Sequence, residues 1–296
     1  LVSDDPRRLE AAIEEALYRG MKQGHTCLPQ KDVQSRLLKL LGDSNLAERA
    51  LNQSATPTAC QSLQYRVVDG LYQATGMHVI ESYVAQRLRQ LIGAANAEGQ
   101  SSLFLPRATS VRELNAVVDT YEVEHKLRLS KEQRDAIRAC VEFNLSLILG
   151  GAGTGKTTVL KAIYRTLEAL HPGIAIFQMA LAGRAAQRMT QATGREAFTI
   201  ARFMATIHPS QISLGTVIVI DEMSMVDVIL MYRLLRHLPE GIQLILVGDP
   251  NQLPPIGPGL VLHALAGLPT IPQTELKVVQ RQTSASGIPQ VASAIR

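Results

Sequence analysis

An apolar run that ends in a glycine-rich loop is the feature that most constrains this chain. Residues 147–149 are apolar, and the motif G-x-x-x-x-G-K-T follows them from Gly150. Val159, Leu160 and Ile163 then recur at helical spacing. A strand, a loop and a helix in this order are the context in which such a motif binds the phosphates of a nucleotide. The sequence therefore predicts a strand and a helix arranged around one anion-binding turn.

The loop has the residues that phosphate binding needs. Its glycines lack the Cβ atoms that would keep a phosphate away from the backbone N–H groups, which can form a nest at a positive helix N-terminus. Lys156 is expected to reach the β- and γ-phosphates, and the Thr157 hydroxyl suits Mg²⁺, because a hard ion prefers oxygen. The alternative is a glycine-rich loop in which Gly-Lys-Thr occurs by chance, and the strand and helix that flank this loop argue against it. The predicted nucleotide-binding residues are Gly150, Gly151, Ala152, Gly153, Thr154, Gly155, Lys156, Thr157 and Thr158.

Composition describes an ordinary globular protein of 296 residues, with 46% hydrophobic and 19% charged residues, long enough for two domains. The net charge of +4 is too mild to argue for nucleic acid by itself. Cys27, Cys60 and Cys140 form no C-x-x-C pair, so we expect reduced thiols in a cytoplasmic protein, with no disulfide framework and no zinc site. No apolar run approaches the roughly 18 residues of a membrane span. The chain begins at Leu1 without a signal-like apolar core, and we expect it to be a piece of a longer protein.

The first third of the chain reads as a small helical module. Periodicity and breakers predict helices over residues 6–23, 29–41, 46–52 and 77–92, a weak strand pair at 63–68 and 71–72, and a hinge at 93–106. Three helices with a hairpin favour a winged-helix-like module, a shape that binds duplex nucleic acid about as often as it serves as an adaptor. We therefore expect a smaller, mainly helical, DNA-binding or adaptor domain over residues 1–106 and a nucleotide-binding domain over 107–296.

Gln133 has two interpretations. After a predicted helix over residues 110–126, Ser130 and Gln133 fit a reciprocal capping box at the start of the next helix, so the simpler role of Gln133 is to close a helix end. Its functional role would be to read the adenine edge of ATP, because helicases place a glutamine just upstream of their phosphate-binding loop.

Two acids follow the next well-defined strand. Residues 217–220 are apolar throughout, as expected inside a parallel sheet, and Asp221 and Glu222 come directly after them. Asp221 is expected to hold the Mg²⁺ shell, while Glu222 can accept a proton from the attacking water. An Asp-Glu pair after an apolar run is common by chance, and it gains meaning from its place downstream of Lys156.

Two more polar residues follow predicted strands. Gln252 comes after the strand at residues 244–247 and can bond the γ-phosphate or the lytic water, although a polar turn residue is the simpler interpretation. Arg281 follows a predicted strand at 275–279 and can neutralise charge on the transferred phosphoryl group, although a solvated surface arginine is simpler. Alternating strands and helices over 145–296 favour an α/β fold with a doubly wound parallel sheet and nucleotide at its carboxyl edge.

In order, these motifs resemble the first RecA-like motor domain of the RecD-like superfamily 1 DNA helicases, the family of the exodeoxyribonuclease V alpha subunit. The resemblance rests on Gln133, the phosphate-binding loop, A-L-A-G-R-A-A, T-I-A-R-F, V-I-D-E-M-S-M-V-D, V-G-D-P-N-Q-L-P-P and Q-R-Q, and more weakly on residues 20–126. It implies a P-loop NTPase that uses ATP and Mg²⁺ to move 5′ to 3′ on single-stranded DNA and to unwind duplex in DNA repair or recombination. It assigns Lys156, Thr157, Asp221, Glu222, Gln252 and Arg281 to ATP hydrolysis, and implies that Gly183, Arg184, Thr199 and Arg202 lie near the DNA backbone. The alternative interpretation of Arg184 and Arg202 is that they are charged residues on an exposed helix surface, with no contact to DNA.

Some positions depart from the family pattern. Ala182 stands where the family usually has threonine, Ala201 where it usually has histidine, and residues 204–215 are short where relatives insert a duplex-splitting hairpin. A second motor domain is absent from the chain, so we expect the isolated chain to bind nucleotide weakly and to be nearly inactive as a motor. Two alternatives stay open: a different P-loop ATPase, or a non-catalytic adaptor that docks on the partner subunits of a helicase–nuclease complex through residues 1–126.

Overall fold

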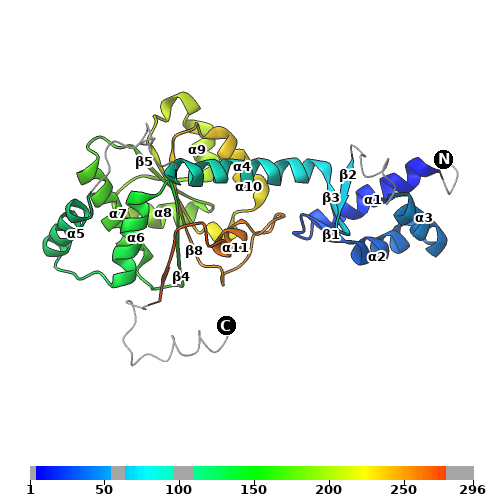
Figure 1. Cartoon of the computed structure of the whole chain (residues 1–296), viewed down its shortest axis with the longest axis horizontal. Helices are drawn as coiled ribbons and strands as arrows, with labels where there is room; N and C mark the ends of the chain where they lie inside the picture. The colour runs from blue at the N-terminus through cyan, green and yellow to red at the C-terminus, as the bar shows by residue number, and fades with distance from the viewer. Residues whose placement is uncertain (1–4, 55–63, 97–109, 278–296) are drawn as a thin grey trace. The chain divides into compact units, whose positions relative to one another are not determined.

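The structure, a computed structural model, describes residues 5–54, 64–96 and 110–277 (Figure 1). The chain divides into two compact units. The first unit consists of Leu1–Ala85, Asp227–Tyr232 and Pro255–Gly259, and the second of Gln86–Val226, Arg233–Pro254 and Leu260–Arg296. The domain boundary predicted after residue 106 lies outside the described residues. No helix in the described ranges is long and apolar enough to cross a membrane.

The first unit has the predicted helices and hairpin. Its elements are α1 (Pro6–Met21), β1 (Leu28–Pro29), α2 (Gln30–Leu41), α3 (Ser44–Ser54), β2 (Tyr65–Val68), β3 (Leu71–Ala74) and the start of α4 (Thr75–Asn96). The strands form an antiparallel sheet in the order β1-β3-β2. The short strand β1 was not predicted. The predicted hinge begins too early, because residues 93–96 still belong to α4, and its remainder lies outside the described residues.

A helix cap, turn residues and one buried polar contact account for how elements of the first unit begin, turn and join. Asp5 caps α1 by accepting a bond from the Arg7 N–H, and Pro6 occupies the first helical turn, where its missing N–H costs nothing. Asp69 and Gly70 both adopt positive φ between β2 and β3, as a tight hairpin turn requires. Tyr72 is buried, and its hydroxyl lies 2.8 Å from the Ser54 hydroxyl, so the hairpin is joined to α3 by a satisfied polar contact.

The second unit is built on a parallel sheet, as the sequence predicted. The six strands run in the order β6-β5-β7-β8-β4-β9, and all neighbours are parallel. Their bounds are β4 (Leu145–Gly150), β5 (Ile176–Ala180), β6 (Ala197–Thr199), β7 (Val217–Asp221), β8 (Gln243–Gly248) and β9 (Gln273–Leu276). Strand β9 starts two residues before the predicted strand at 275–279 and ends at Leu276, and residues 278–279 are not described.

Helices cover both faces of this sheet (Figure 1). On one face, Ile148, Val219 and Val247 share a core cluster with α5 (Val111–His125), α6 (Lys131–Glu142), α7 (Lys156–Leu170) and α8 (Gly183–Thr193). Side chains alternate along a strand, so the neighbouring residues point to the opposite face. There Phe203 of α9 (Ile200–Thr206) contacts Phe177 of β5 and His237, the last residue of α10 (Val228–His237). Helices α9, α10 and α11 (Val261–Ala266) were not predicted from the sequence.

Candidate nucleotide-binding site

The loop between β4 and α7 needs glycine at two positions for different reasons. A Cβ atom on Gly150 would lie 2.7 Å from Thr154 Oγ1 and 3.1 Å from the Leu276 carbonyl oxygen, so only glycine lets the loop pack against β9. Gly155 is the N-cap of α7 with φ 86°, a left-handed conformation that other residues rarely adopt. The Thr154 hydroxyl donates to the Gly151 carbonyl at 2.9 Å and holds the loop closed.

Lys156 is the first residue of α7 and turns back into the loop. Its Nζ donates to the carbonyl oxygens of Gly150 at 2.6 Å and Gly151 at 2.8 Å. The ammonium group therefore stands at a helix N-terminus, where the helix dipole adds a partial positive charge. A group of negative phosphate oxygens is the ligand that such a turn favours.

The two acids lie at the carboxyl end of β7. Asp221 Oδ1 accepts a bond from the Glu222 N–H at 2.8 Å, and Glu222 takes a left-handed conformation with φ 55°. Burial raises the pKa of Asp221, opposed by the Glu222 N–H and by the charge of Lys156. Burial and the neighbouring Asp221 raise the pKa of Glu222, while Arg188 and Lys156 oppose that rise. The environment thus favours a proton acceptor stronger than an exposed glutamate.

These groups meet in one cavity of about 660 Å³. The predicted residues that line it come from the ends of four elements, since the carboxyl ends of β4, β7 and β8 and the start of α7 lie at one edge of the sheet. They are Gly151, Ala152, Gly153, Gly155, Lys156, Thr157, Thr158, Asp221, Glu222 and Gln252.

Of the predicted ATP-site residues, three described ones are not part of this lining, and a fourth is not described. Gln133 is 2% exposed and closes the capping box, because its Oε1 accepts from the Ser130 N–H at 2.9 Å. Gly150 and Thr154 support the loop rather than face the cavity. Arg281 lies outside the described residues.

Asp249 and Arg188 also line the cavity, and the sequence analysis gave them no role. Asp249 is buried at the end of β8 and accepts a bond from the Asn251 N–H at 3.0 Å, which shapes the turn that carries Gln252. Arg188 Nη2 lies 3.5 Å from Glu222 Oε1. The rule that found Asp221, a carboxylate at the exit of a buried strand, would also have found Asp249. No comparable sequence signal marks Arg188.

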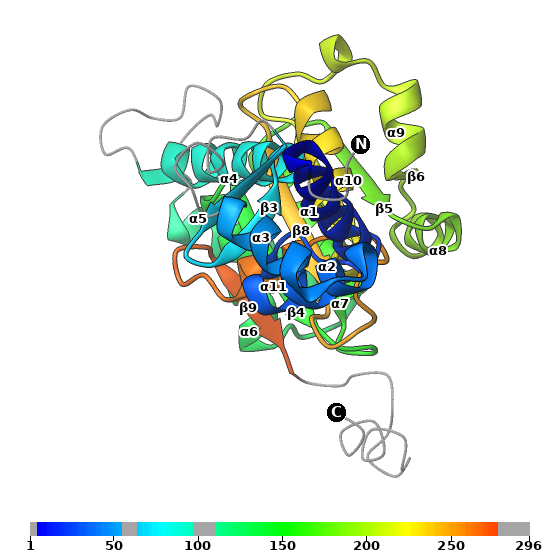
Figure 2. The same cartoon turned by 90° about the vertical axis from the view of Figure 1, so that its right-hand side faces the viewer.

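The four residues predicted to lie near DNA come from the ends of β5 and β6, where α8 and α9 begin (Figure 2). Gly183 starts α8, and a Cβ atom built on it would lie 4.0 Å from Thr199 Cγ2, so these two residues are neighbours. The Thr199 hydroxyl caps α9 by accepting from the Arg202 N–H at 3.0 Å. Arg184 is exposed, whereas Arg202 pairs with Glu196 at 2.9 Å and lies over the Phe198 ring. Their contact with DNA stays a prediction.

Replacing Gly150 by alanine is expected to destabilise the second unit by about 1–3 kcal/mol, because the added methyl overlaps the Thr154 hydroxyl and crowds the Leu276 carbonyl. Thermal unfolding followed by circular dichroism measures the loss. Gly267→Ala is the matched control in the same unit, since its methyl would meet the nearest atoms at 3.8 Å, an ordinary contact. Equal midpoints for the two variants would show that the loop can move away from β9.

Comparison with known proteins shows which sequences this chain is similar to. Residues 128–296 match the family described as AAA domain. The ATP-dependent RecD2 DNA helicase of Deinococcus radiodurans is 31% identical over 314 residues, which cover 98% of this chain and 40% of that protein. The RecBCD enzyme subunit RecD of Mycolicibacterium smegmatis is 33% identical over 197 residues, which cover 56% of this chain and 35% of that subunit.

The chain spans less than half the length of these curated relatives. Among solved structures, the Pif1 helicase of Candida albicans aligns with a TM-score of 0.43 at 23% identity, over 57% of this chain and 44% of that one. The family match covers more than half of the chain. The chain belongs to the AAA domain family and is a RecD-like member of the superfamily 1 helicases.

Proposed function

We propose that this chain is the ATP-hydrolysing part of a DNA helicase that moves 5′ to 3′ along single-stranded DNA and unwinds duplex during DNA repair or recombination in the cytoplasm. The observation that carries the proposal is the cavity in which the loop lysine faces Asp221, Glu222 and Gln252. A relative described as an ATP-dependent DNA helicase matches 98% of the chain, which supports the choice of DNA as the track.

The predicted ATP-site residues would have different roles in the hydrolysis of ATP. The backbone N–H groups of the loop and Lys156 would hold the phosphates, and Glu222 would take a proton from the attacking water. Gln252 would bond the γ-phosphate or that water. Arg281, outside the described residues, would neutralise charge on the transferred group. Gln133 would read adenine through its amide NH₂, since its Oε1 serves the helix cap.

The cavity also suits Mg²⁺. Thr157 and Asp221 both line it and offer a hydroxyl and a carboxylate oxygen, the hard donors that Mg²⁺ prefers. Burial opposes the ionised form of Asp221, and a neighbouring divalent cation would offset that cost. When bound, Mg²⁺ would neutralise negative charge on the phosphate oxygens. We therefore assign Thr157 and Asp221 to the metal.

The DNA strand would follow the start of α8 and α9, where Gly183 and Arg184 adjoin Thr199 and Arg202. Backbone N–H groups and arginines there would hold phosphates without reading the sequence. The pair between Arg202 and Glu196 does not prevent this, because both side chains are more than half exposed and such pairs contribute at most about 1 kcal/mol. A DNA phosphate can therefore replace Glu196 as the partner of Arg202.

The first test is the steady-state ATPase rate of the protein, with and without single-stranded DNA. We expect DNA to stimulate hydrolysis, and Glu222→Gln to lower kcat by about 10²–10⁴-fold because the amide cannot accept the proton. Nucleotide affinity should remain, which a fluorescent ATP analogue would report.

Two outcomes would contradict the proposal. Hydrolysis that does not respond to DNA would favour a different P-loop ATPase. No hydrolysis by the wild type would favour a non-catalytic adaptor, acting with the other subunits of a helicase–nuclease complex, and one relative is described as a subunit of the RecBCD enzyme.

Arg188→Ala is expected to have a far smaller effect than Glu222→Gln. The Arg188 side chain is 74% exposed and its Nη2 lies 3.5 Å from Glu222 Oε1, so the pair contributes at most about 1 kcal/mol, or roughly fivefold in rate. Parallel measurements of kcat and KM on both variants would check this. A fall of about 100-fold or more for Arg188→Ala would mean that Arg188 acts on the phosphoryl group itself.

A further inference from the structure

A basic groove lies between two helices of the first unit. Helices α1 and α2 pack through their apolar faces, which include Leu17 on α1 and Leu37 on α2. Beside this contact is a cavity of about 630 Å³. Four cationic side chains line it: Arg19 near the end of α1, Lys22 at the C-cap that follows α1, and Arg36 and Lys39 on α2. Asp32 is the one carboxylate in that lining, so the groove has an excess of positive charge.

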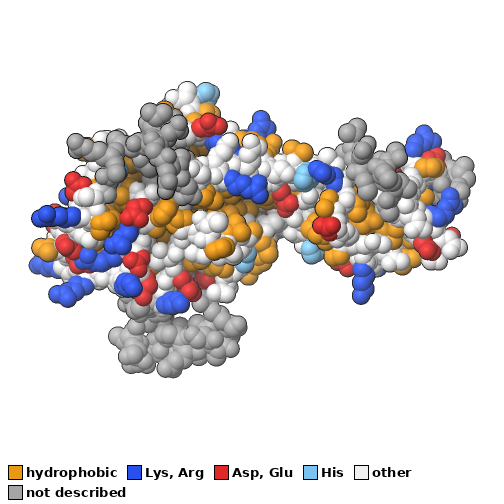
Figure 3. Space-filling view, viewed as in Figure 1, with side chains coloured by type: hydrophobic (Ala, Val, Ile, Leu, Met, Phe, Trp, Pro, Cys, Tyr) orange, Lys and Arg blue, Asp and Glu red, His pale blue; other side chains and the backbone are white. Residues whose placement is uncertain are grey.

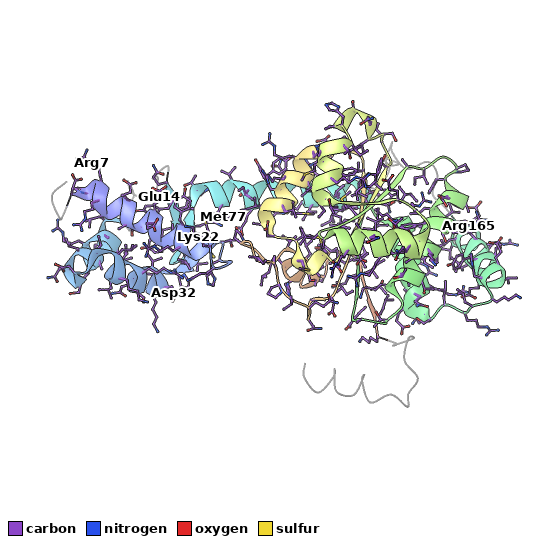
Figure 4. All side chains as sticks on the ribbon, turned by 180° about the vertical axis from the view of Figure 1, so that it is seen from behind. Arg7, Glu14, Lys22, Asp32, Met77 and Arg165 are labelled. Carbon is purple, nitrogen blue, oxygen red and sulfur yellow. The ribbon has the colours of Figure 1, made fainter. Side chains whose placement is uncertain are left out.

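The helical register holds these charges in two facing rows. On α2, residues 32, 35, 36 and 39 line the groove with the i, i+3, i+4, i+7 spacing of one helix face. On the other side, Arg19 lines the groove from α1, and Lys22 and Gln23 line it from the turn that follows α1. Figure 4 shows Lys22 near the end of α1 and Asp32 on α2, with Arg7 at the opposite end of α1. Side chains three positions apart on a helix stand about 5–6 Å from each other, so each row is dense in charge.

Two of the arginines are fixed by hydrogen bonds. Arg36 Nη2 donates to Gln23 Oε1 at 2.5 Å, which joins α2 to the segment that follows α1. Arg19 Nε donates to Glu15 Oε1 at 2.7 Å on its own helix. These bonds reduce the side-chain entropy that a ligand would otherwise have to remove. Like charges held close together repel one another, and a polyanion would relieve that repulsion.

The charged surface over α5 and α6 differs from this groove. Over α5 and α6, basic and acidic side chains are interspersed (Figure 3), and Arg134 pairs with both Asp119 and Glu122 at 2.7 Å. That surface is largely compensated within the protein. In the groove, Asp32 is the single carboxylate in the lining, and Glu15, outside the lining, pairs with Arg19, so two carboxylates stand against four cations.

We propose that this groove binds the phosphate backbone of DNA. The lining distinguishes DNA from a protein partner, because all of its residues are polar or charged, whereas protein interfaces depend on buried apolar and aromatic anchors. Interfaces with DNA are more polar and strongly positive, and Gln23 and Ser35 add neutral donors of the kind that bond phosphate oxygens. The inference rests on the proposed function for the choice of DNA as the polyanion, and it makes the first unit a second contact with the track.

The test is fluorescence anisotropy of a labelled, mixed-sequence single strand and of its duplex, titrated with the 296-residue chain without ATP. The groove variant is Lys22→Glu with Lys39→Glu. Its control, Arg7→Glu with Lys31→Glu, makes the same charge change on α1 and α2 outside the groove. We expect the groove variant to lose about tenfold or more in affinity relative to its control, with a slope of log K against log salt shallower by about one to two between 50 and 200 mM. The probe with the larger loss identifies the preferred form of DNA.

Equal affinities for the groove variant and its control, on both probes, would overturn the proposal. Thermal melting checks that both variants fold, and the neutral pair Lys22→Gln with Lys39→Gln, set against Arg7→Gln with Lys31→Gln, must give the same ranking. DNA binding by the groove can be tested separately from the proposed motor activity. A DNA-independent ATPase together with a selective loss in the groove variant would refute the motor and keep the groove.

Discussion

Glycine at position 150 lets the phosphate-binding loop pack directly against β9, and that contact supports, from behind, the loop that lines the cavity. The Leu276 carbonyl and the Thr154 hydroxyl occupy the space that a side chain would need. With the loop fixed there, the parallel register of β4, β8 and β7 brings the ends of these strands to the same edge. The loop lysine, the two acids and Gln252 then meet although they come from distant parts of the sequence.

The sequence predicted the elements whose pattern is both local and strong. The buried strand before Gly150, the strand that ends at Asp221 and the capping box at Ser130 all appear as expected. The missed helices α9 and α11 are short, seven and six residues, so they lack the repeated apolar period that identifies a longer helix. Strand β9 was misplaced because only one of its four residues is buried, so its apolar pattern is weak.

For the site, residue types were predictable from sequence motifs, whereas the neighbours of each residue are known only from the structure. Glu222 was predicted as the base, but its left-handed backbone and its contact with Arg188 depend on packing between β7 and α8 that no local pattern encodes. Arg202 was predicted to approach DNA. The sequence alone could not show that Glu196, rather than another carboxylate, is its ion-pair partner. The basic groove was missed because the net charge of +4 averages over acidic side chains elsewhere.

The central claim is that the cavity beside Lys156 holds a nucleotide together with Mg²⁺, and equilibrium titration of the chain with a fluorescent ATP analogue tests it most directly. With wild-type chain, Mg²⁺ should strengthen binding. Lys156→Ala should weaken it by about tenfold or more, since a charge-assisted contact to phosphate is lost. Asp221→Asn should bind with little response to Mg²⁺. Equal affinity and equal Mg²⁺ response in all three proteins would contradict the account.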